Sequence, residues 1–480
     1  MRYAPHSDRT RGDDAMNHEV LTADEVRKIH ETSMRVLETV GVVMPVEEAQ
    51  QVFRSHGIRV ENARVYLTEA QVMAALADVP RRFVLHARNP ERSVEIGEGS
   101  AVTAPGYGAP FLVDRETGKR SPTLEDYANL TKIAHALPNQ DVSGHLIVEP
   151  KGVDQAHLHM LHAHLVHSDK PFMGSTAGAE GATQTLEMAR IAFDEDFGDR
   201  AVTVSLVNSL SPLGYANDML DVLLVYAKAR QPVIVAALAM GGTTAPVSLA
   251  GMLAMQTAEL LAGLVLTQLV SPGMPVLFGS TSSNVDMRLG SLSIGSPELS
   301  MVISAHAQLA RFYGIPSRAG GALTDANFPD AQAGFESMLG LMTTVESGVD
   351  FILHSAGILS SYLAFSYEKF VLDDEMCGMT RCVREGFSVD EDALGYDVIA
   401  AVGPGGNYLS QPHTIKRCRT EFWKPELCDR RGLAGWVADG GKDAVDRATA
   451  RWQQLLAEHE DPAMDAGARR RLDAYLETRI

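Results

Sequence analysis

Two apolar runs between Gly320 and Gly357 end in clusters of polar residues. The first stretch reads Gly320-Gly321-Ala322-Leu323-Thr324-Asp325-Ala326-Asn327-Phe328-Pro329-Asp330-Ala331-Gln332, and the second reads Asp350-Phe351-Ile352-Leu353-His354-Ser355-Ala356-Gly357. Short buried strands that end in acids, amides, histidine and glycine are typical of the catalytic rim of a (β/α)8 barrel, where the carboxyl ends of the strands converge on one mouth. The two stretches therefore predict an α/β protein with a site at such a mouth.

The same rhythm extends toward the N-terminus. Apolar runs, each followed by a helix-length segment, predict strands at 142–148, 171–174, 202–207, 232–236, 275–279, 315–318 and 351–354, and an eighth strand near 370–372. Strands that alternate with helical segments predict a parallel sheet. About eight such repeats favour a closed (β/α)8 (TIM) barrel over an open sheet.

The predicted barrel has additions at both ends. We expect residues 1–140 to form an N-terminal extension of helices and short strands that packs on the barrel, residues 141–400 to form the barrel, and residues 401–480 to form a C-terminal helical segment. Within the extension, Thr22 and Glu25 have the spacing of a capping box at the start of a helix. Thr123 is the expected N-cap of a second helix that runs to Leu137.

Composition narrows the class of protein. The chain has 480 residues, 45% of them hydrophobic, and a formal net charge of −19, which disfavours nucleic acid or an anionic membrane as a partner and mildly favours a cationic substrate. No apolar stretch follows the charges of residues 1–9, and the apolar window 260–266 is too short to span a bilayer. Four cysteines in a chain of this length do not predict a disulfide framework. We therefore expect a cytoplasmic protein.

Several familiar chemistries lack support. The histidines His157, His159, His162, His164 and His167 could supply a zinc pair if they lie on a helix, but no His-Glu-x-x-His spelling accompanies them, so helix packing is the favoured interpretation. The glycine pairs at 241–242, 320–321 and 403–406 lack the spacing of a dinucleotide or phosphate loop. Lys369 is the one lysine near a predicted strand end, and its neighbours indicate a structural salt bridge rather than a Schiff base.

The polar and aromatic residues near the predicted strand ends form the candidate site. We expect catalytic roles for Asp325, Asn327, Asp330 and His354, substrate-binding roles for Tyr107, Gln332, Phe365 and Tyr367, and no metal ligands. Carboxylates and aromatic faces without a nucleophile suit the holding of a cation. If the substrate also carries a carboxylate, Arg318 or Arg288 could pair with it. The alternative is that Tyr367 packs with Phe370 and that Arg288 bridges Asp286.

Several motifs resemble those of one family. They are the segments Leu206–Leu213, Gln231–Val235, Gly279–Arg288, Leu323–Asp325 with Pro329–Gln332, Ser366–Asp373 and Gly403–Gly406. With these motifs the chain resembles the trimethylamine methyltransferase family of corrinoid-dependent methyltransferases. The resemblance implies a (β/α)8 barrel whose mouth accepts a separate corrinoid protein. The cofactor would then be a cob(I)alamin or related corrinoid carried by that partner, with none bound permanently.

The chain departs from the archaeal trimethylamine enzymes of that family, which carry pyrrolysine near the loop that corresponds to residues 325–332. Asn327 is our best match for that position, and every residue here is an ordinary amino acid. The departure favours the non-pyrrolysine branch, whose members resemble glycine betaine and related quaternary-amine methyltransferases. Ile358 and Asn407 stand where family members often have Trp and His, so substrate choice can also differ.

The resemblance and the residues together predict an enzyme. We expect it to move a methyl group from a quaternary amine, such as glycine betaine, to the Co(I) of a corrinoid protein, and to form a homo-oligomer. The alternatives are a non-catalytic protein that binds a quaternary amine for regulation, a trimethylamine methyltransferase, and a (β/α)8 lyase or hydrolase that uses the histidine cluster and a metal.

Overall fold

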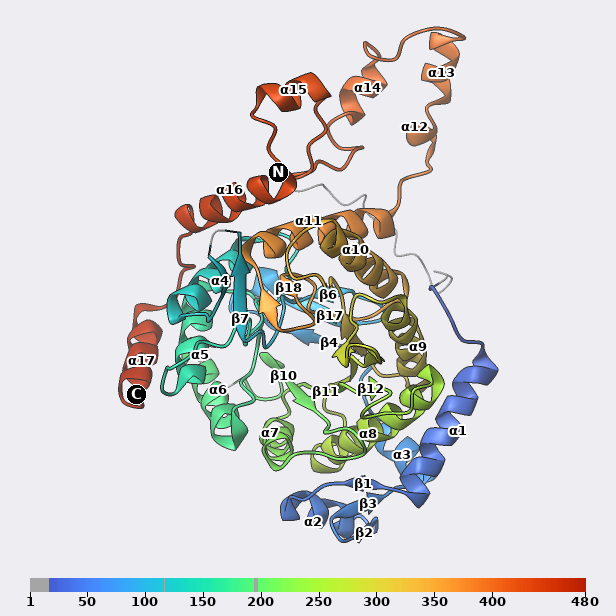
Figure 1. Ribbon diagram of the computed structural model, residues 1–480, viewed down its shortest axis with the longest axis vertical. Coiled ribbons are helices and arrows are strands. Elements are labelled where there is room, and N and C mark those ends of the chain that lie inside the picture. The colour runs from blue at the N-terminus through green and yellow to red at the C-terminus, as the bar shows by residue number, and fades with distance from the viewer. Residues whose placement is uncertain (1–16, 116, 194–196) are drawn as a thin grey trace.

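A curled parallel sheet forms the centre of the protein in a computed structural model that describes residues 17–115, 117–193 and 197–480 (Figure 1). Its seven strands lie in the order β6-β17-β16-β13-β11-β10-β9, and every neighbouring pair is parallel. The strands are β6 (Val102–Thr103), β9 (Phe172–Met173), β10 (Thr203–Asn208), β11 (Val233–Ala237), β13 (Val276–Ser280), β16 (Ser317–Gly320) and β17 (Phe351–Leu353). Residues 1–9, for which we expect no secretory signal, lie outside the described residues.

Residues 142–144 connect the two edges of this sheet. Val142 N–H donates to the carbonyl oxygen of Thr103 on β6 at 3.0 Å. On the other side, Ser143 N–H donates to Pro171 O, and Met173 N–H on β9 donates to Gly144 O, both at 2.9 Å. The segment predicted as the first strand therefore bridges β6 and β9 by backbone hydrogen bonds.

The eighth strand predicted near residues 370–372 is wrong. These residues lie inside α11 (Tyr367–Glu385), whose N-cap Ser366 accepts a hydrogen bond from Lys369 N–H. Phe370 and Val371 are both buried, and three apolar residues in a row do not separate a strand from one buried turn of helix. The strand that pairs with β17 is instead β6, which falls within the segment predicted as an N-terminal extension.

In the part of the chain that the structure describes, eight long helices follow the strands of the sheet, and they surround it (Figure 1). They are α4 (Leu124–Ala136), α5 (Ala156–His167), α6 (Gly178–Phe193), α7 (Asn217–Lys228), α8 (Leu249–Val270), α9 (Pro297–Tyr313), α10 (Ala331–Glu346) and α11. The predicted capping residue Thr123 accepts a hydrogen bond from Asp126 N–H at the start of α4. By length and composition α8 could cross a membrane, but most of it is buried inside the protein, which is the behaviour of a core helix.

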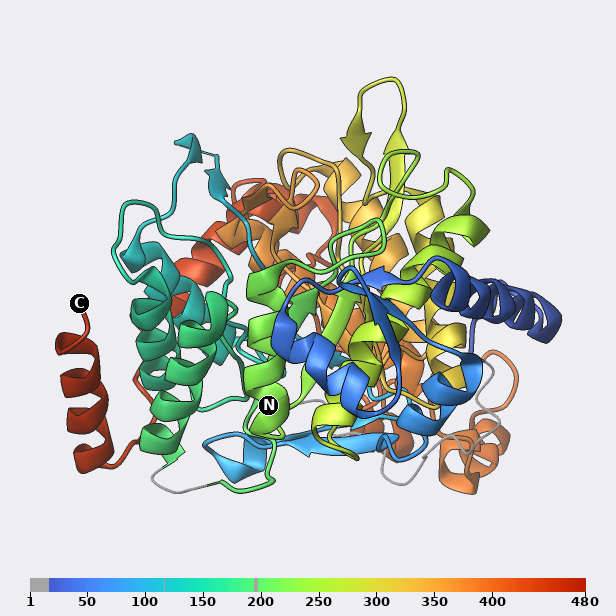
Figure 2. The same cartoon turned by 90° about the horizontal axis from the view of Figure 1, so that it is seen from below.

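The N-terminal elements pack against α8 and across the amino end of the sheet. They are α1 (Ala23–Thr39), β1 (Val42–Val43), α2 (Glu47–Ser55), β2 (Arg59–Glu61), β3 (Arg64–Tyr66), α3 (Glu69–Leu76), β4 (Arg82–Leu85), the 3-10 turn η1 (Pro90–Arg92) and β5 (Val94–Gly97). The capping box predicted from Thr22 and Glu25 is present at the start of α1. In Figure 2 the β4–β5 pair lies at one end of the molecule.

The loops that follow the sheet strands lie at the opposite end, which we call the carboxyl rim. The loops of this rim contain short strands: β7 (Phe111–Asp114), β8 (Gly118–Arg120), β12 (Met240–Gly241), β14 (Ser283–Asp286), β15 (Ser291–Leu292), β18 (Ile358–Leu359) and β19 (Ala364–Phe365). The β14–β15 hairpin stands highest at this end in Figure 2. Since the carboxyl ends of parallel strands meet here, the rim is where the predicted site residues are expected.

After α11 the chain projects away from the body of the protein and then packs against it again (Figure 1). The departing segment contains α12 (Glu391–Leu394), α13 (Tyr396–Val402), α14 (Pro412–Arg417) and α15 (Leu433–Ala438). The returning helix α16 (Ala444–Ala457) packs on α11 and α4, and α17 (Ala466–Glu477) packs on α5 and α6. The four cysteines, Cys377, Cys382, Cys418 and Cys428, are free thiols.

Candidate functional site

Arg318 on β16 is a buried cation with unused hydrogen-bond donors among the described residues. Its side chain is among the largest fully buried ones, with 1% of the residue exposed. Within residues 17–115, 117–193 and 197–480, its Nε and Nη2 atoms have no hydrogen-bond acceptor. Burial lowers the pKa of the guanidinium to about 10, and the neighbouring Tyr362 and Tyr107 act in the opposite direction. The group therefore stays protonated at neutral pH, and a positive charge is held inside the protein with unused donors.

Tyr107 and His354 lie beside this arginine and are bonded to each other. The backbone N–H of Tyr107 donates to Nδ1 of His354 at 3.1 Å, and the Tyr107 hydroxyl lies 3.3 Å from Thr176 Oγ1. Tyr107 comes from the loop after β6, and His354 directly follows β17, which pairs with β6. The structure thus brings together two predicted site residues that are far apart in the sequence.

His354 is a neutral imidazole in this setting. Burial and then the charge of Arg318 hold its pKa well below the usual value. Because Nδ1 accepts a hydrogen bond from Tyr107, the ring proton belongs on Nε2. His354 therefore offers neither a negative partner for Arg318 nor a second positive charge.

Tyr362 completes the group and was not among the predicted site residues. Its ring lies 4.9 Å from the His354 ring, centroid to centroid, in a tilted arrangement. Ser360, Ser361 and Tyr362 all have positive φ angles, of 51°, 52° and 75°. Residues other than glycine rarely adopt this backbone conformation. Strained backbone of this kind concentrates at functional sites. The one sequence signal was an aromatic residue in the loop after β17.

Asp325 supplies the negative charge of the site. Its carboxylate accepts hydrogen bonds from Ile294 N–H at 2.8 Å, Gly295 N–H at 3.0 Å and the Ser361 hydroxyl at 2.7 Å. Burial raises the pKa of Tyr362, the Asp325 charge raises it further, and Arg318 opposes the shift. Tyr362 therefore lies within the electrostatic reach of one cation and one anion.

Three other predicted residues lie on the carboxyl rim with local partners. The Asn327 side-chain oxygen accepts from the Ser360 hydroxyl at 2.9 Å and so ties the β16 loop to the loop that carries Tyr362. Asp330 is the N-cap of α10 and accepts from Ala333 N–H at 3.1 Å. Gln332 is exposed and donates to Glu336 at 2.9 Å. These three contacts shape the loop around Asp325.

The structure places three predicted substrate-binding residues apart from Arg318. Phe365 is fully buried and packs edge-on against Phe370, so it presents no face to a ligand. The hydroxyl of Tyr367 donates to the Asp126 carboxylate at 3.1 Å, and its ring lies against Trp452 of α16. Arg288 is 89% exposed at its side chain and pairs with Asp286 at 3.3 Å on the β14–β15 hairpin.

The histidines of α5 diverge rather than form one site. His157 contacts Gln184, His162 contacts Asp473, and His164 is buried between Tyr127 and Phe172. His167 joins His459 and Asp461 on the outer face, where ligand atoms of the three lie within 4.8 Å of one another. That group ties the segment between α16 and α17 to the end of α5 and lies outside the Arg318 cluster.

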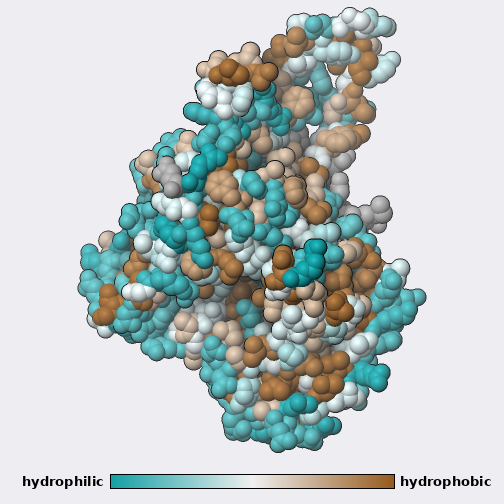
Figure 3. All heavy atoms as spheres, viewed as in Figure 1, coloured by the Kyte–Doolittle hydropathy of each residue, from teal (hydrophilic) through white to brown (hydrophobic). Residues whose placement is uncertain are grey.

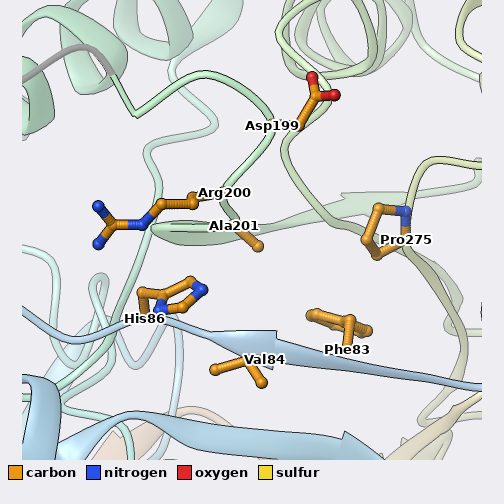
Figure 4. Close-up of a pocket in the computed structure, with 7 residues that line it drawn as sticks. All are labelled: Phe83, Val84, His86, Asp199, Arg200, Ala201 and Pro275. Carbon is orange, nitrogen blue, oxygen red and sulfur yellow. The ribbon is translucent and has the colours of Figure 1, made fainter.

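A pocket of about 390 Å³ lies at the amino end of the sheet, away from this cluster (Figure 4). It is lined by Phe83, Val84, His86, Asp199, Arg200, Ala201 and Pro275. Ala201 and Pro275 precede β10 and β13, so the pocket opens below the strands. Residues at this end of α/β barrels serve stability rather than catalysis.

Comparison with known proteins identifies the family. Residues 6–480 match the family model described as trimethylamine methyltransferase. The chain belongs to the trimethylamine methyltransferase family. It is 48% identical over 466 residues to a glycine betaine methyltransferase from Desulfitobacterium hafniense. The aligned region covers 96% of this chain and 97% of that protein.

Other relatives in the family have names that specify different amines as substrates. A proline betaine:corrinoid methyltransferase from Eubacterium limosum is 34% identical, with 95% of this chain and 96% of that protein covered. A trimethylamine methyltransferase from Desulfitobacterium hafniense is 32% identical, with 88% and 86% covered. The crystal structure of the Methanosarcina barkeri monomethylamine methyltransferase is similar in fold, with a TM-score of 0.51, 15% identity and 96% of both chains covered.

Proposed function

We propose that this protein transfers a methyl group from a carboxylate-bearing quaternary amine of the glycine betaine class to a reduced corrinoid on a separate carrier protein. Family membership and the names of its relatives support the reaction type. The observation that carries the choice of substrate is Arg318, a buried guanidinium whose Nε and Nη2 lack partners among the described residues.

We also propose that the curled sheet is a closed (β/α)8 barrel with residues 142–144 as its second strand. The backbone bonds from this segment to Thr103 on one side and to Pro171 and Met173 on the other support closure. Each strand is then followed by one of the eight surrounding helices. With β6 as the first strand, the domain boundary near residue 140 moves toward the N-terminus.

A carboxylate is the ligand that Arg318 is equipped to bind. Burying an ionised group without a partner is costly, so buried charges are normally paired. The planar guanidinium presents several donors that match the two oxygens of a carboxylate. A substrate that brings its own carboxylate would supply the missing acceptors.

The positive end of such a substrate also has a place. A trimethylammonium group donates no conventional hydrogen bond and is held by aromatic faces and nearby negative charge. Tyr107 and Tyr362 supply rings, and Asp325 supplies the negative charge near Tyr362. Arg318 and Asp325 thus form a charge pattern opposite in sign to that of a zwitterionic betaine, and trimethylamine, which lacks a carboxylate, fits it less well.

The residues need to do little proton chemistry. A quaternary nitrogen already carries the positive charge that makes the neutral amine a leaving group. A corrinoid in its Co(I) state, when delivered to the carboxyl rim, would supply the nucleophile that takes the methyl group. The task of Arg318, Tyr107, Tyr362 and Asp325 is to remove water from the substrate and to fix the direction of one methyl group.

The carboxyl rim has the surface expected of a docking site for the carrier protein. Six large apolar side chains are exposed there, with exposed fractions between 39% and 78%: Leu210, Leu238, Val247, Met287, Leu289 and Leu363. Exposed apolar groups gathered in one region mark interaction surfaces. A partner that seats its corrinoid over the rim would cover them.

An anaerobic transfer assay tests this function. The protein is mixed with glycine betaine and a reduced corrinoid on a carrier protein, and methyl–cobalt formation is followed by absorbance. We expect transfer with glycine betaine and a loss of at least about 30-fold in Asp325→Asn, because removing one partner from a desolvated charge contact costs about 2 kcal/mol or more. Asp286→Asn, which alters a partly exposed carboxylate on the β14–β15 hairpin, is the matched control.

Two outcomes would contradict the proposal. Tight binding of glycine betaine without transfer to any reduced corrinoid would favour the regulatory alternative. Transfer from trimethylamine that is faster than transfer from any betaine would overturn the role of Arg318. For an enzyme of this type we place the reaction in the cytoplasm.

A further inference from the structure

Three potential metal ligands meet on the outer face of the protein, at the end of α5. They are His167, the last residue of α5, and His459 and Asp461, which lie in the connection between α16 and α17. One ligand atom of each residue lies within 4.8 Å of those of the other two. Two imidazoles and a carboxylate form a ligand set that divalent transition metals use in proteins.

The carboxylate of Asp461 lies between the two imidazoles. Its Oδ1 atom is 2.6 Å from Nδ1 of His167 and 3.2 Å from Nε2 of His459. Around a tetrahedral zinc ion with bonds of about 2.0–2.2 Å, the donor atoms lie about 3.3–3.6 Å apart. A small movement of Asp461 away from His167 therefore makes room for an ion. The ion would take the place of the protons that the two nitrogens otherwise donate to the carboxylate.

The surroundings hold these side chains in place. The His459 side chain is 4% exposed, and its ring packs edge-on against His167 and His135, with centroids 6.1 and 5.6 Å apart. Arg469 of α17 lies 3.9 Å from the other oxygen of Asp461, which leaves Oδ1 directed at the histidines. Groups behind a metal ligand commonly fix its orientation in this way. The Asp461 side chain is 41% exposed, so an ion and a water molecule as fourth ligand can reach the site from solvent.

The three residues link the C-terminal helix to the body of the protein. Within α17 only Ala468 and Leu472 are buried, and Figure 3 shows mostly hydrophilic side chains over this helix, at the left of the view. Apolar burial therefore contributes little to the docking of α17 on α5 and α6. The contact between His162 and Asp473, at 2.7 Å, supplies one polar tie. A metal ion at the connection before α17 would supply a stronger tie that needs no apolar area.

We propose that His167, His459 and Asp461 bind one zinc ion, which fastens the C-terminal helix to α5. Imidazole nitrogens with one carboxylate suit zinc, whereas the hard ions Mg²⁺ and Ca²⁺ take mainly oxygen ligands. The site is structural, because it lies outside the Arg318 cluster, and it does not depend on the proposed function. A zinc ion here would depart from our sequence-based expectation of no metal ligands, and it gives a role to the last histidine of α5.

Zinc titration of the metal-free, full-length protein by calorimetry tests the site. The parent for this test carries Cys418→Ser with Cys428→Ser, because these two exposed thiols could bind zinc elsewhere. It should bind one zinc ion per chain. His167→Gln and Asp461→Asn, each made in the parent, should weaken binding by at least about 100-fold, since even residues behind the ligands alter metal affinity about 10–100-fold. His162→Gln removes a neighbouring histidine of the same helix and should bind zinc as tightly as the parent.

Two further measurements separate loss of the metal from damage to the fold. Parent and Asp461→Asn should both unfold cooperatively in EDTA, and zinc should raise the unfolding midpoint of the parent alone, because a ligand that binds only the native state stabilises it. Zinc should also slow hydrogen exchange in residues 466–477 of the parent, and Mg²⁺ should have neither effect.

The proposal is overturned by a parent that binds no zinc, which would show that any zinc taken up by the wild type goes to the thiols. It is also overturned if His167→Gln and Asp461→Asn bind zinc as tightly as the parent.

Discussion

Lys369 and Arg318 are both fully buried cations, and the protein treats them in opposite ways. Lys369 donates to both oxygens of Asp373, at 2.6 and 2.5 Å, and to the Ser337 hydroxyl at 2.8 Å. Arg318 has comparable burial, but its Nε and Nη2 meet no acceptor among the described residues. The satisfied charge holds helices together, whereas we propose that the open charge receives its partner from the substrate.

The surroundings of the two cations agree with this difference. Lys369 lies within α11, and its bond to Ser337 ties that helix to α10. Arg318 lies near the strained residues Ser360 to Tyr362 and near His354, which also has a positive φ angle. The satisfied cation thus joins two helices, whereas the open cation lies on a strand among the candidate site residues.

The largest effect is expected for Lys369→Met. This substitution leaves Asp373 buried without its counterion, and the free energy of unfolding should fall by about 3–5 kcal/mol. Urea denaturation followed by circular dichroism measures it. The double variant Lys369→Met with Asp373→Leu should recover most of the loss, since an apolar pair needs no partner. A single variant as stable as the wild type would show that the pair is not structural.

Buried neutral histidines test how burial of a titratable group affects the stability of the protein. Burial lowers the pKa of His164 to about 3 and that of His306 to about 4, whereas the unfolded chain titrates near 6.5. The unfolded state therefore binds protons first as the pH falls, and the free energy of unfolding should fall by about 1.4 kcal/mol per histidine between pH 7.5 and 5.5.

The share of one histidine can be isolated. His306 stacks on Phe278 with ring centroids 4.7 Å apart, so His306→Phe keeps an aromatic ring at the position. Its loss of stability between pH 7.5 and 5.5, measured by urea denaturation, should be about 1.4 kcal/mol smaller than that of the wild type. Equal losses in the two proteins would contradict the assignment.

The smallest effect is expected at Tyr362. Tyr362→Leu removes a ring face from the proposed cation site and should weaken glycine betaine binding by about 0.5–2 kcal/mol in calorimetry. Tyr362→Phe keeps the face and should bind within a few-fold of the wild type. If the two variants bind equally well, the aromatic face has no role in recognition.

Much of the sheet was predictable because its strands are apolar runs bounded by turn residues. β10, β11 and β13 each overlap a predicted run and end one residue beyond it, and the apolar window 260–266 lies inside the buried helix α8. β6 could not be found, because Val102 and Thr103 form a strand of only two residues that is recognised by its pairing with β17. Residues 370–372 were predicted as a strand but lie in α11, because one turn of buried helix is as apolar as a strand.

The candidate site was predictable in its residue types and less so in its membership. Asp325 and His354 followed from their position at strand ends, and Arg318 was named as a partner for a carboxylate. Tyr362 was missed because nothing in the sequence signals three successive positive φ angles. Tyr367 was included because aromatic residues near a strand end look alike until their contacts, here with Asp126, are known.

Substrate discrimination by Arg318 is the most direct test of the account. The transfer rate kcat/KM is measured for glycine betaine and for choline, which shares the trimethylammonium group but has a hydroxyl in place of the carboxylate. The wild type should prefer glycine betaine by at least about 30-fold, equivalent to about 2 kcal/mol. Arg318→Met should lose that preference while its free energy of unfolding stays equal to or above that of the wild type. An Arg318→Met enzyme that keeps the wild-type preference would contradict the claim that this arginine binds the carboxylate of the substrate.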